Sequence, residues 1–335
     1  MSDPCLSLAD IHALVERCLI HNGCDAANAE AVADTLTAAE RDGCASHGLF
    51  RLPGYIASLR NDKVDGTADP IVDDLPGSVV RVDGKGGFAP LALKRGRAPL
   101  AERARKHGVA ALSLVHIYHM AALWIEVEAL ASEGLCAFAF TASKPFVVPA
   151  GGNKPLFGTN PMAFAWPRPG RAPLVFDMAT AAMARGEIMI AAREGHDLPP
   201  GTGVDADGQA TTDPNAILAG GMSPMAGYKG SALALMVELL AGALIGENLS
   251  VEAGAADNDD GGPARGGELM IAIDPARFGD AAGWAEHGEV LFENMLAQSG
   301  VRLPGDRRYA NRARTPDDGV IVPTGLHDQI VDLAG

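Results

Sequence analysis

The first part of the chain alternates apolar and polar positions with the period of an α-helix. Apolar residues recur three and four positions apart across residues 8–18 and again across residues 29–39, which predicts two amphipathic helices. Ser7 stands where a capping residue opens the first helix, and Asp25 does the same for the second. Gly23 separates the two segments. We therefore expect a pair of capped helices in this part of the molecule.

Short apolar runs and longer periodic segments alternate through the rest of the chain. Runs rich in β-branched and aromatic residues predict strands at 79–84, 109–115, 137–141, 162–166, 174–177 and 268–273. Helical periodicity predicts further helices at 46–59, 91–107, 179–190, 229–245 and 286–299. Pro53 stands either in the first turn of its helix or inside it. The 229–245 segment is apolar on nearly all sides, which is typical of a buried helix.

Two segments rich in Gly and Asp interrupt this pattern. Residues 195–215 are expected to form a loop, and residues 257–267 an acidic, solvated and mobile loop. The run from Asp257 to Gly261 superficially suggests a calcium loop, but the correctly spaced terminal glutamate is missing. We therefore interpret the acidic segment as a solvated connection.

Composition and charge narrow the class of protein. The chain of 335 residues is long enough for about two domains, and 47 % of its residues are hydrophobic. Its net charge of −15 argues against a nucleic-acid partner, although one or two local cations would suffice for a small anionic substrate. The chain lacks both a leader pattern and the apolar run of about 18 residues that predicts a membrane span. Five cysteines without paired or metal-ligand spacing predict free thiols in a reducing cytoplasm.

Several familiar signatures of cofactor and metal binding are missing. A Gly-x-Gly-x-x-Ala match at 201–206 follows two prolines and not a strand, so we interpret it as a loop. No Walker-type loop or nucleophile elbow supports ATP chemistry or hydrolysis. His116 and His119 are three residues apart, without a third ligand at recognisable spacing. We therefore predict no metal site.

The segment around His47 is the strongest candidate for chemistry. If residues 47–51 are helical, His47 and Arg51 share one face. A guanidinium can hold a carboxylate through two parallel hydrogen bonds, and an imidazole can protonate the neighbouring atom. Ser46 can contact the imidazole or cap the helix. By residue type alone, a capped helix with a surface histidine and arginine explains this pattern better than a catalytic pair does.

Three further segments place polar groups at turns. Residues 157–161 contain Thr159, whose hydroxyl is expected to be exposed. Lys229 and the free amides at the start of the 229–245 helix are suited to an anion. The 302–308 segment places three arginines around a Pro-Gly turn, where they could hold phosphates. Taken singly, each segment fits an ordinary loop or cap as well.

Taken together, these segments resemble a known family. The strings SHGLFR at 46–51, FGTNP at 157–161, FDMA at 176–179 and GYKG at 227–230 follow one another in this order. This order resembles the malate/L-lactate dehydrogenase family of the non-Rossmann type, and within it the Δ1-piperideine-2-carboxylate/Δ1-pyrroline-2-carboxylate reductases. The strings that support the narrower likeness lie at 40–43, 46–55, 121–124, 191–195 and 302–309. The resemblance covers essentially the whole chain.

The resemblance implies an α/β fold of α+β type that explains the missing Gly-rich fingerprint. A non-Rossmann cofactor domain with a mainly antiparallel sheet would span residues 116–275. A helical substrate and dimerisation domain would combine residues 1–115 with residues 276–335. The family implies a homodimer with a small-molecule substrate, and neither a nucleic-acid nor a membrane partner.

The resemblance also implies roles for individual residues. It gives Ser46 and His47 as relay and proton donor, and places four residues on the substrate: Arg51, Thr159, Arg185 and Gly186. It implies cofactor contacts from His119, Met120, Ala121, Ala122, Leu123, Asp177, Met178, Ala179, Lys229, Arg302, Leu303, Pro304, Gly305, Asp306, Arg307 and Arg308. The arginines of the last segment suit a 2′-phosphate, which favours NADPH, with NADH as the other possible cofactor.

The implied reaction is NADPH-dependent reduction of a cyclic α-imino acid to L-proline or L-pipecolate. Two positions depart from the family. Glu187 stands where malate and lactate relatives tend to carry lysine, and Met120 stands where an aromatic is commoner. We expect Glu187 to orient the imidazole of His47 as a third catalytic residue. The alternatives are an NAD(P)-dependent dehydrogenase of malate, lactate or a ureidoglycolate-like acid, and a non-catalytic small-molecule binding protein on the same scaffold.

Overall fold

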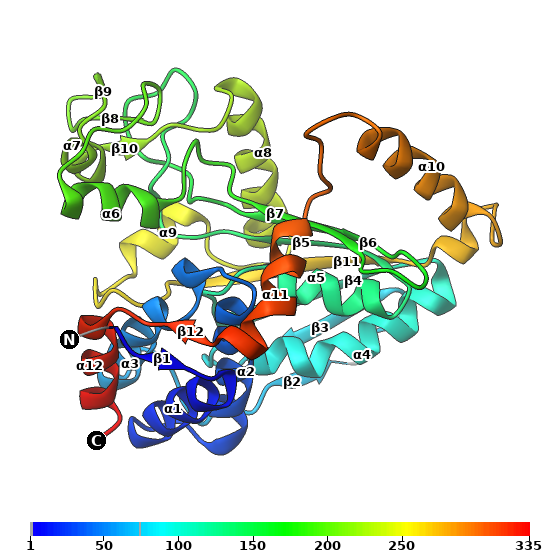
Figure 1. Cartoon of the computed structure of the whole chain (residues 1–335), viewed down its shortest axis with the longest axis horizontal. Helices are drawn as coiled ribbons and strands as arrows, with labels where there is room; N and C mark the ends of the chain where they lie inside the picture. Colours follow the sequence, from blue (N-terminus) through cyan, green and yellow to red (C-terminus); the bar gives the residue numbers. More distant parts are fainter. Residues whose placement is uncertain (1–2, 74) are drawn as a thin grey trace.

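The first layer of the molecule is helical and joins both ends of the chain. The computed structural model describes residues 3–73 and 75–335. The layer contains α1 (Leu8–His21), α2 (Ala26–Arg41), α3 (Leu52–Arg60) and α12 (Thr324–Leu333), with β1 (Cys5–Leu6) paired to β12 (Val320–Ile321). Figure 1 shows the two termini close together beside these helices. The expected caps are confirmed, since the side chains of Ser7 and Asp25 accept backbone N–H groups of α1 and α2.

The second layer is a mixed sheet whose strand order runs β2-β3-β4-β11-β5-β6-β7. Its strands are β2 (Ile71–Asp73), β3 (Val79–Asp83), β4 (Val109–Tyr118), β11 (Arg265–Ile273), β5 (Cys136–Thr141), β6 (Met162–Trp166) and β7 (Leu174–Met178). Within the described residues β3 and β4 run parallel, and the other neighbouring pairs are antiparallel. The expected mainly antiparallel sheet is confirmed.

Helices cover both faces of this sheet. On one face, α4 (Ala89–His107) and α5 (Trp124–Ser132) pack against the strands over a large aliphatic core. The other face contacts α8 (Tyr228–Glu238) and the π-helical turn that follows it, Leu239–Ala243. The alternation of β11 explains the two cores, because Met270 and Ala272 enter the first and Leu269 enters the second.

The remaining elements form a smaller lobe and a projecting arm. The lobe contains α6 (Arg185–Glu194), α7 (Pro214–Ala219), α9 (Ser250–Ala255) and a small sheet of β8 (Gly203–Val204), β9 (Ala210–Thr211) and β10 (Gly221–Met222). The short 3-10 turn Pro275–Arg277 leads to α10 (Trp284–Leu296), which projects from the body in Figure 1, and α11 (Asp306–Asp318) returns to it. The arm is attached where Trp284 packs against Trp166 and Arg168 pairs with Glu289.

Two helix boundaries differ from the sequence prediction. Residues 46–59 do not form one helix: two 3-10 turns, Ala45–His47 and Leu49–Arg51, precede α3, and Pro53 lies in the first turn of α3. The helix expected at 179–190 begins only at Arg185. Both differences arise because contacts with more distant residues set the conformation ahead of each helix. Leu49 donates its N–H to the Glu40 side chain. Thr180 and Ala182 donate theirs to the carbonyls of Thr159 and Ser223.

The segment 229–245 is largely helical, as predicted, but the prediction that this helix is buried is wrong. α8 and its π-helical extension cover most of this range, but Leu235, Leu239 and Leu244 are 48 %, 52 % and 66 % exposed. An all-apolar pattern shows that burial of every face of a helix would be favourable. It does not show whether residues of the same chain cover each face.

The acidic segment after residue 256 is a loop, as expected, and Asp259 is exposed, but two of its other carboxylates are not solvated. Asp257 and Asp260 have side chains that are 1 % and 2 % exposed, and both pair with Lys63 of the helical layer. Lys144 pairs with Asp257 as well. The segment therefore joins the helical layer to the end of β5 through buried ion pairs. Its partners lie far away in the sequence, so no local pattern could reveal them.

Three other expectations, on the domain boundary, the cysteines and membrane-spanning helices, can be compared with the structure. β4 crosses the expected division at residues 115 and 116, and one sheet contains strands from both proposed domains. The five cysteines, all within the described part of the chain, are free thiols. Among the described helices, none combines the length and the apolarity needed to cross a bilayer.

Candidate functional site

Glu40 fixes the shape of the segment that carries the candidate catalytic residues. Its buried carboxylate accepts the backbone N–H of Leu49 at 2.6 Å. A Cβ placed on Gly48 would lie 2.1 Å from Glu40 Oε1, so any larger residue there would displace the Glu40 side chain. The chain therefore breaks between the two 3-10 turns, and residues 46–51 adopt a compact bend instead of the expected helix.

The bend brings Ser46, His47 and Arg51 together. Ser46 Oγ lies 3.0 Å from His47 Nδ1, and Arg51 Nε donates to the carbonyl of Ser46 at 2.8 Å. Burial, followed by the positive charge of Arg51 and then by His119, lowers the pKa of His47 to about 4. The imidazole is thus neutral at neutral pH when the site holds no anion.

The start of α6 lies against this bend. A Cβ placed on Gly186 would be 3.8 Å from the Cβ of Ser46, which puts Gly186 beside the serine. The Arg185 guanidinium stacks over the ring of Phe146 at 3.9 Å, and burial lowers its pKa. Glu187 has an exposed side chain, and no hydrogen bond or ion pair between described residues joins it to His47.

The turn with Thr159 is braced by residues that the sequence did not single out. Ser143 Oγ accepts the N–H of Thr159 at 3.1 Å and lies 3.3 Å from its hydroxyl. Asn160 is fully buried with a positive φ of 38°, and its amide donates to Glu238 of α8 at 2.7 Å. These contacts hold the Thr159 hydroxyl in place.

His119 lies in a buried cluster with two glutamates, which we name the His119 cluster: His119, Glu126 and Glu268. His119 Nε2 is 2.9 Å from Glu126 Oε1 and 3.5 Å from Glu268 Oε2. The three groups are spaced so that they could hold a metal ion. However, His119 Nδ1 accepts the N–H of Ala121 at 3.4 Å, so the proton of the neutral ring is on Nε2, where a metal would bind. The glutamates are 7 and 149 positions from the histidine, and no spacing in the sequence signals them.

The other expected cofactor residues lie along the starts of α5 and α11. Asp177 is partly buried and accepts the N–H of Trp124 at 3.1 Å at the start of α5, and burial raises its pKa. Ala121, Ala122 and Leu123 are buried just before that helix, while Met120 is partly exposed. Met178 is 38 % exposed, and Ala179 is partly buried behind it.

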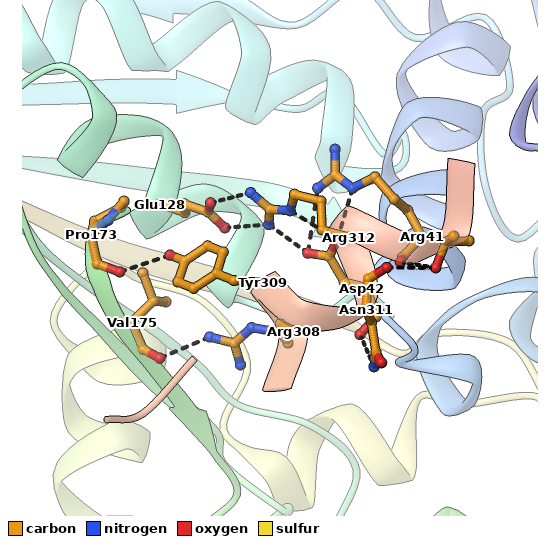
Figure 2. A network of polar contacts seen from close by, with 10 residues as sticks. Arg41, Asp42, Glu128, Pro173, Val175, Arg308, Tyr309, Asn311 and Arg312 are labelled. Atoms are coloured by element: carbon orange, nitrogen blue, oxygen red, sulfur yellow. Dashed lines mark hydrogen bonds and ion pairs between the residues drawn. The ribbon is translucent and has the colours of Figure 1, made fainter. Parts of the chain in front are cut away.

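The arginines of the C-terminal segment have different surroundings. Arg308 donates to the carbonyl of Val175 at 2.8 Å (Figure 2). Its guanidinium also lies over the ring of Trp124, so it is engaged within the protein. Arg302 and Arg307 have exposed side chains, as does Lys229 in the first turn of α8. In the turn between Arg302 and Arg307, Leu303 is buried and Pro304 is exposed. Gly305 has a φ of 95°, and Asp306 accepts the N–H of Leu303.

An ion-pair network anchors the helix that carries this segment. Arg312 of α11 binds Asp42 through Nε at 2.9 Å and also binds both carboxylate oxygens of Glu128 (Figure 2). Arg41 pairs with Asp42 at 2.7 Å. Two cations thus balance two carboxylates, and Asp42 has no exposed surface on its side chain. The network links α2, α5 and α11 at one point.

Comparison with known proteins agrees with this arrangement. Residues 6–331 match the model of the malate/L-lactate dehydrogenase family. A Δ1-pyrroline-2-carboxylate reductase of Burkholderia ambifaria is 49 % identical over 336 residues, covering 99 % of this chain and 98 % of that protein. A (2R)-3-sulfolactate dehydrogenase (NADP⁺) of Chromohalobacter salexigens is 42 % identical over 97 % of this chain and 96 % of that protein. The crystal structure of Δ1-piperideine-2-carboxylate reductase from Pseudomonas syringae is 43 % identical, with a TM-score of 0.94 over 98 % of this chain and 99 % of that one.

A mainly antiparallel sheet, joined to a helical layer that carries a histidine–arginine pair, together with these matches places the chain among the non-Rossmann oxidoreductases that use NAD(P)H. The chain belongs to the malate/L-lactate dehydrogenase family.

Proposed function

We propose that the protein reduces a cyclic α-imino acid, Δ1-pyrroline-2-carboxylate or Δ1-piperideine-2-carboxylate, to L-proline or L-pipecolate with NADPH. The observation that carries the proposal is the partly buried pair of His47 and Arg51, which offers one proton-transfer group and one carboxylate anchor within a single bend. The names of the most similar relatives support the imine as the acceptor.

Arg51 and His47 have different roles toward the substrate: Arg51 binds it and His47 protonates it. The planar guanidinium of Arg51 binds the substrate carboxylate, and Thr159 with Arg185 and Gly186 completes the substrate pocket. The bound carboxylate neutralises Arg51, which removes one of the causes that hold the pKa of His47 down. The imidazole then takes up a proton and gives it to the ring nitrogen, while Ser46 holds the ring through Nδ1.

The exposed cations fit a phosphate-rich cofactor. Arg302 and Arg307 flank the Gly305 turn, and Lys229 lies at the N-terminal end of α8, where free amides also favour an anion. NADPH, when bound, supplies the hydride for C2 of the imine. Two free arginines favour the additional 2′-phosphate, so NADPH is preferred to NADH; Arg307→Gln should raise the KM for NADPH more than the KM for NADH.

Glu187 is the third proposed catalytic residue, although it makes no direct contact with the imidazole in this conformation. It lies in the first turn of α6, next to Gly186, which faces Ser46. Glu187→Gln should lower kcat without changing the folding of the protein. The matched control is Glu194→Gln, an exposed glutamate at the end of the same helix. Equal kcat in both variants would remove Glu187 from the catalytic set.

A comparative assay of NADPH oxidation tests the proposed reaction. The purified protein is mixed with pyrroline-2-carboxylate, piperideine-2-carboxylate, pyruvate and oxaloacetate, each at several concentrations. The proposal expects the highest kcat/KM for one of the two imines. Higher values for a keto acid would instead establish a 2-hydroxyacid dehydrogenase, which the likeness to a sulfolactate dehydrogenase keeps as the second candidate. Binding without NADPH oxidation for all four would indicate a non-catalytic protein.

A homodimer accounts for the apolar surface of α8 and the π-helical turn. Tyr228, Leu235, Leu239 and Leu244 are between 48 % and 73 % exposed in a single chain. Contact with a second copy would remove these side chains from water, at about 25 cal/mol per Å² of apolar surface buried. Light scattering should give twice the mass of one chain, and Leu239→Lys should shift the population toward the monomer.

A further inference from the structure

A single carboxylate lies inside the apolar segment that forms α8 and its π-helical turn. Between residues 229 and 245 only Lys229 and Glu238 carry charge, and Lys229 lies in the first turn of the helix. Glu238 is the last residue of α8, and it is 5 % exposed. A carboxylate buried to this extent would strongly disfavour folding unless hydrogen bonds satisfied it. Its partners therefore indicate the role of this position.

Two residues supply the hydrogen bonds that Glu238 accepts. The side-chain amide of Asn160 donates to Oε1 at 2.7 Å, and the backbone N–H of Ser250 donates to Oε2 at 2.8 Å. The hydroxyl of Ser250 also donates to Oε1. Each of these groups is a donor, which suits a carboxylate because it can only accept.

The same two residues hold the turn on either side of Thr159. Asn160 follows the threonine and has a φ of 38°, a backbone conformation that surrounding contacts must enforce. Gly158 precedes the threonine and donates its N–H to the hydroxyl of Ser250 at 2.9 Å. Both neighbours of Thr159 are thus tied to the Glu238 carboxylate, one directly and one through a single hydroxyl.

Glu238 also sets the orientation of the Asn160 amide. The NH₂ group donates to Glu238 and to the carbonyl of Ala234 at 3.1 Å, so the amide oxygen points the other way. There it accepts the N–H of Ser143 at 3.4 Å. Ser143 Oγ in turn accepts the N–H of Thr159 at 3.1 Å. A continuous chain of contacts therefore runs from the end of α8 to the backbone of the threonine.

We propose that Glu238 positions the Thr159 hydroxyl for the substrate and thereby sets the KM for the imino acid. The inference rests on the proposed function, in which Thr159 contacts the substrate. Glu238 acts through Asn160 and Ser250, so it is a positioning residue and not a catalytic one. Lys229, which is proposed to contact the cofactor, lies at the other end of α8. A change that loosened the whole helix would therefore weaken NADPH binding too, whereas a change that acts through Thr159 would affect the imino acid alone.

Steady-state kinetics of Glu238→Gln tests this role. Whichever way the new amide is oriented, its NH₂ group meets a donor, either the amide of Asn160 or the N–H of Ser250. The KM for the better of the two imines should rise about three- to tenfold, as expected for one weakened hydrogen bond to the substrate. The KM for NADPH should stay the same, and kcat should change by less than about twofold. An unchanged KM for the imine, or an equal rise in both KM values, would overturn the proposal.

Glu247→Gln is the matched control for the general effect of altering a buried carboxylate. Glu247 is 7 % exposed and accepts the N–H of His116 in β4 at 2.6 Å, not a group of the Thr159 turn. This variant should leave the KM for the imine unchanged, whatever its effect on Tm. If it raises that KM as much as Glu238→Gln does, the effect is one of general destabilisation, and the proposal is wrong.

A double-mutant cycle with Thr159→Val tests whether the effect passes through the hydroxyl. Valine keeps the shape of the threonine side chain, and Thr159→Val alone should raise the KM for the imine. In that background Glu238→Gln should add less than about a further twofold, because the hydroxyl it positions is gone. Fully additive effects would show that Glu238 acts elsewhere and would overturn the proposal.

Ser250→Ala is the second variant, and it serves if Glu238→Gln does not fold. It removes only the hydroxyl that links Gly158 to Glu238. It should raise the KM for the imine and leave the KM for NADPH unchanged, and an unaltered KM for the imine would refute the chain of contacts. Failure of the proposed function is distinct: wild-type protein would then oxidise no NADPH with either imine, and the role of Glu238 would fall with it.

Discussion

Removal of the Arg312 guanidinium should destabilise the protein and loosen the proposed cofactor segment. In Arg312→Leu, Glu128 loses its cation, while Asp42 keeps only Arg41 and remains without exposed surface. Removing one partner of a buried ion pair costs about 3–5 kcal/mol. Because Arg312 is 27 % exposed and water can partly replace it, we expect a loss of about 2–4 kcal/mol. Leucine also forfeits the stacking of Arg312 over Trp124.

Thermal unfolding measures this loss directly. A shift of about 2 °C per kcal/mol for a chain of this size predicts a Tm lower by about 4–8 °C in Arg312→Leu. The matched control is Arg314→Leu, an exposed arginine on the same helix, which should change Tm by about 1 °C or less. A double-mutant cycle with Glu128→Gln should show a coupling of about 1–3 kcal/mol.

The same variant separates anchoring from chemistry. α11 carries Arg307 and Arg308 at its start, so a loosened α11 should raise the KM for NADPH while the KM for the imine changes little. Equal Tm values for Arg312→Leu and Arg314→Leu, or additivity in the double-mutant cycle, would refute the reasoning. Either result would mean that the network in Figure 2 is a surface arrangement of little energetic weight.

Four further substitutions act on the bend around His47. His47→Ala should lower kcat by about 10²-fold or more with NADPH binding intact; fluorescence titration of NADPH measures the second part, and lost binding with normal turnover would contradict the role. Arg51→Lys should raise the KM for the imine, because a point charge cannot replace the planar fork; unchanged saturation would disprove the anchor. Gly48→Ala should lower Tm, since its methyl group would lie 2.1 Å from a Glu40 oxygen; an unchanged Tm would show that the bend yields easily. The low pKa of His47 also makes folding pH-dependent: its contribution is complete above about pH 6.5 and is lost as the pH falls through about 4, because only the unfolded chain takes up the proton. His47→Gln should therefore flatten the acid side of the stability profile, and an unchanged profile would contradict the burial of the ring.

The elements with local signals were predictable from the sequence. The capped helices α1 and α2 follow directly from their periodicity and from Ser7 and Asp25. The sequence identified His47 and Arg51 as a candidate pair together with Ser46, but it did not predict how the three residues are arranged. The residues were expected to share a helical face, whereas the Glu40 carboxylate folds them into a bend. A contact between a helix end and a backbone nine residues later leaves no periodic trace.

The parts that escaped prediction depend on partners far away in the chain. The burial of Asp257 requires Lys63 and Lys144, and the His119 cluster requires Glu268. A buried charge looks like any other charge in the sequence until its partner is placed beside it. For α8 the error was the opposite one: the sequence predicted burial for a face that is exposed. An apolar pattern cannot reveal whether the same chain or another one covers a helix face.

The position of β11 has a consequence for synthesis of the protein. This strand is central in the sheet, hydrogen-bonded to β4 on one side and to β5 on the other, yet it comes from residues 265–273. At about 5–20 residues per second, a ribosome makes β4 and β5 several seconds before the strand that joins them. During that interval two aliphatic strands have unpaired edges, which are templates for association with other chains. We therefore expect nascent chains to need protection by a chaperone until Ile273 has emerged, and chains truncated before β11 to aggregate instead of forming a smaller domain.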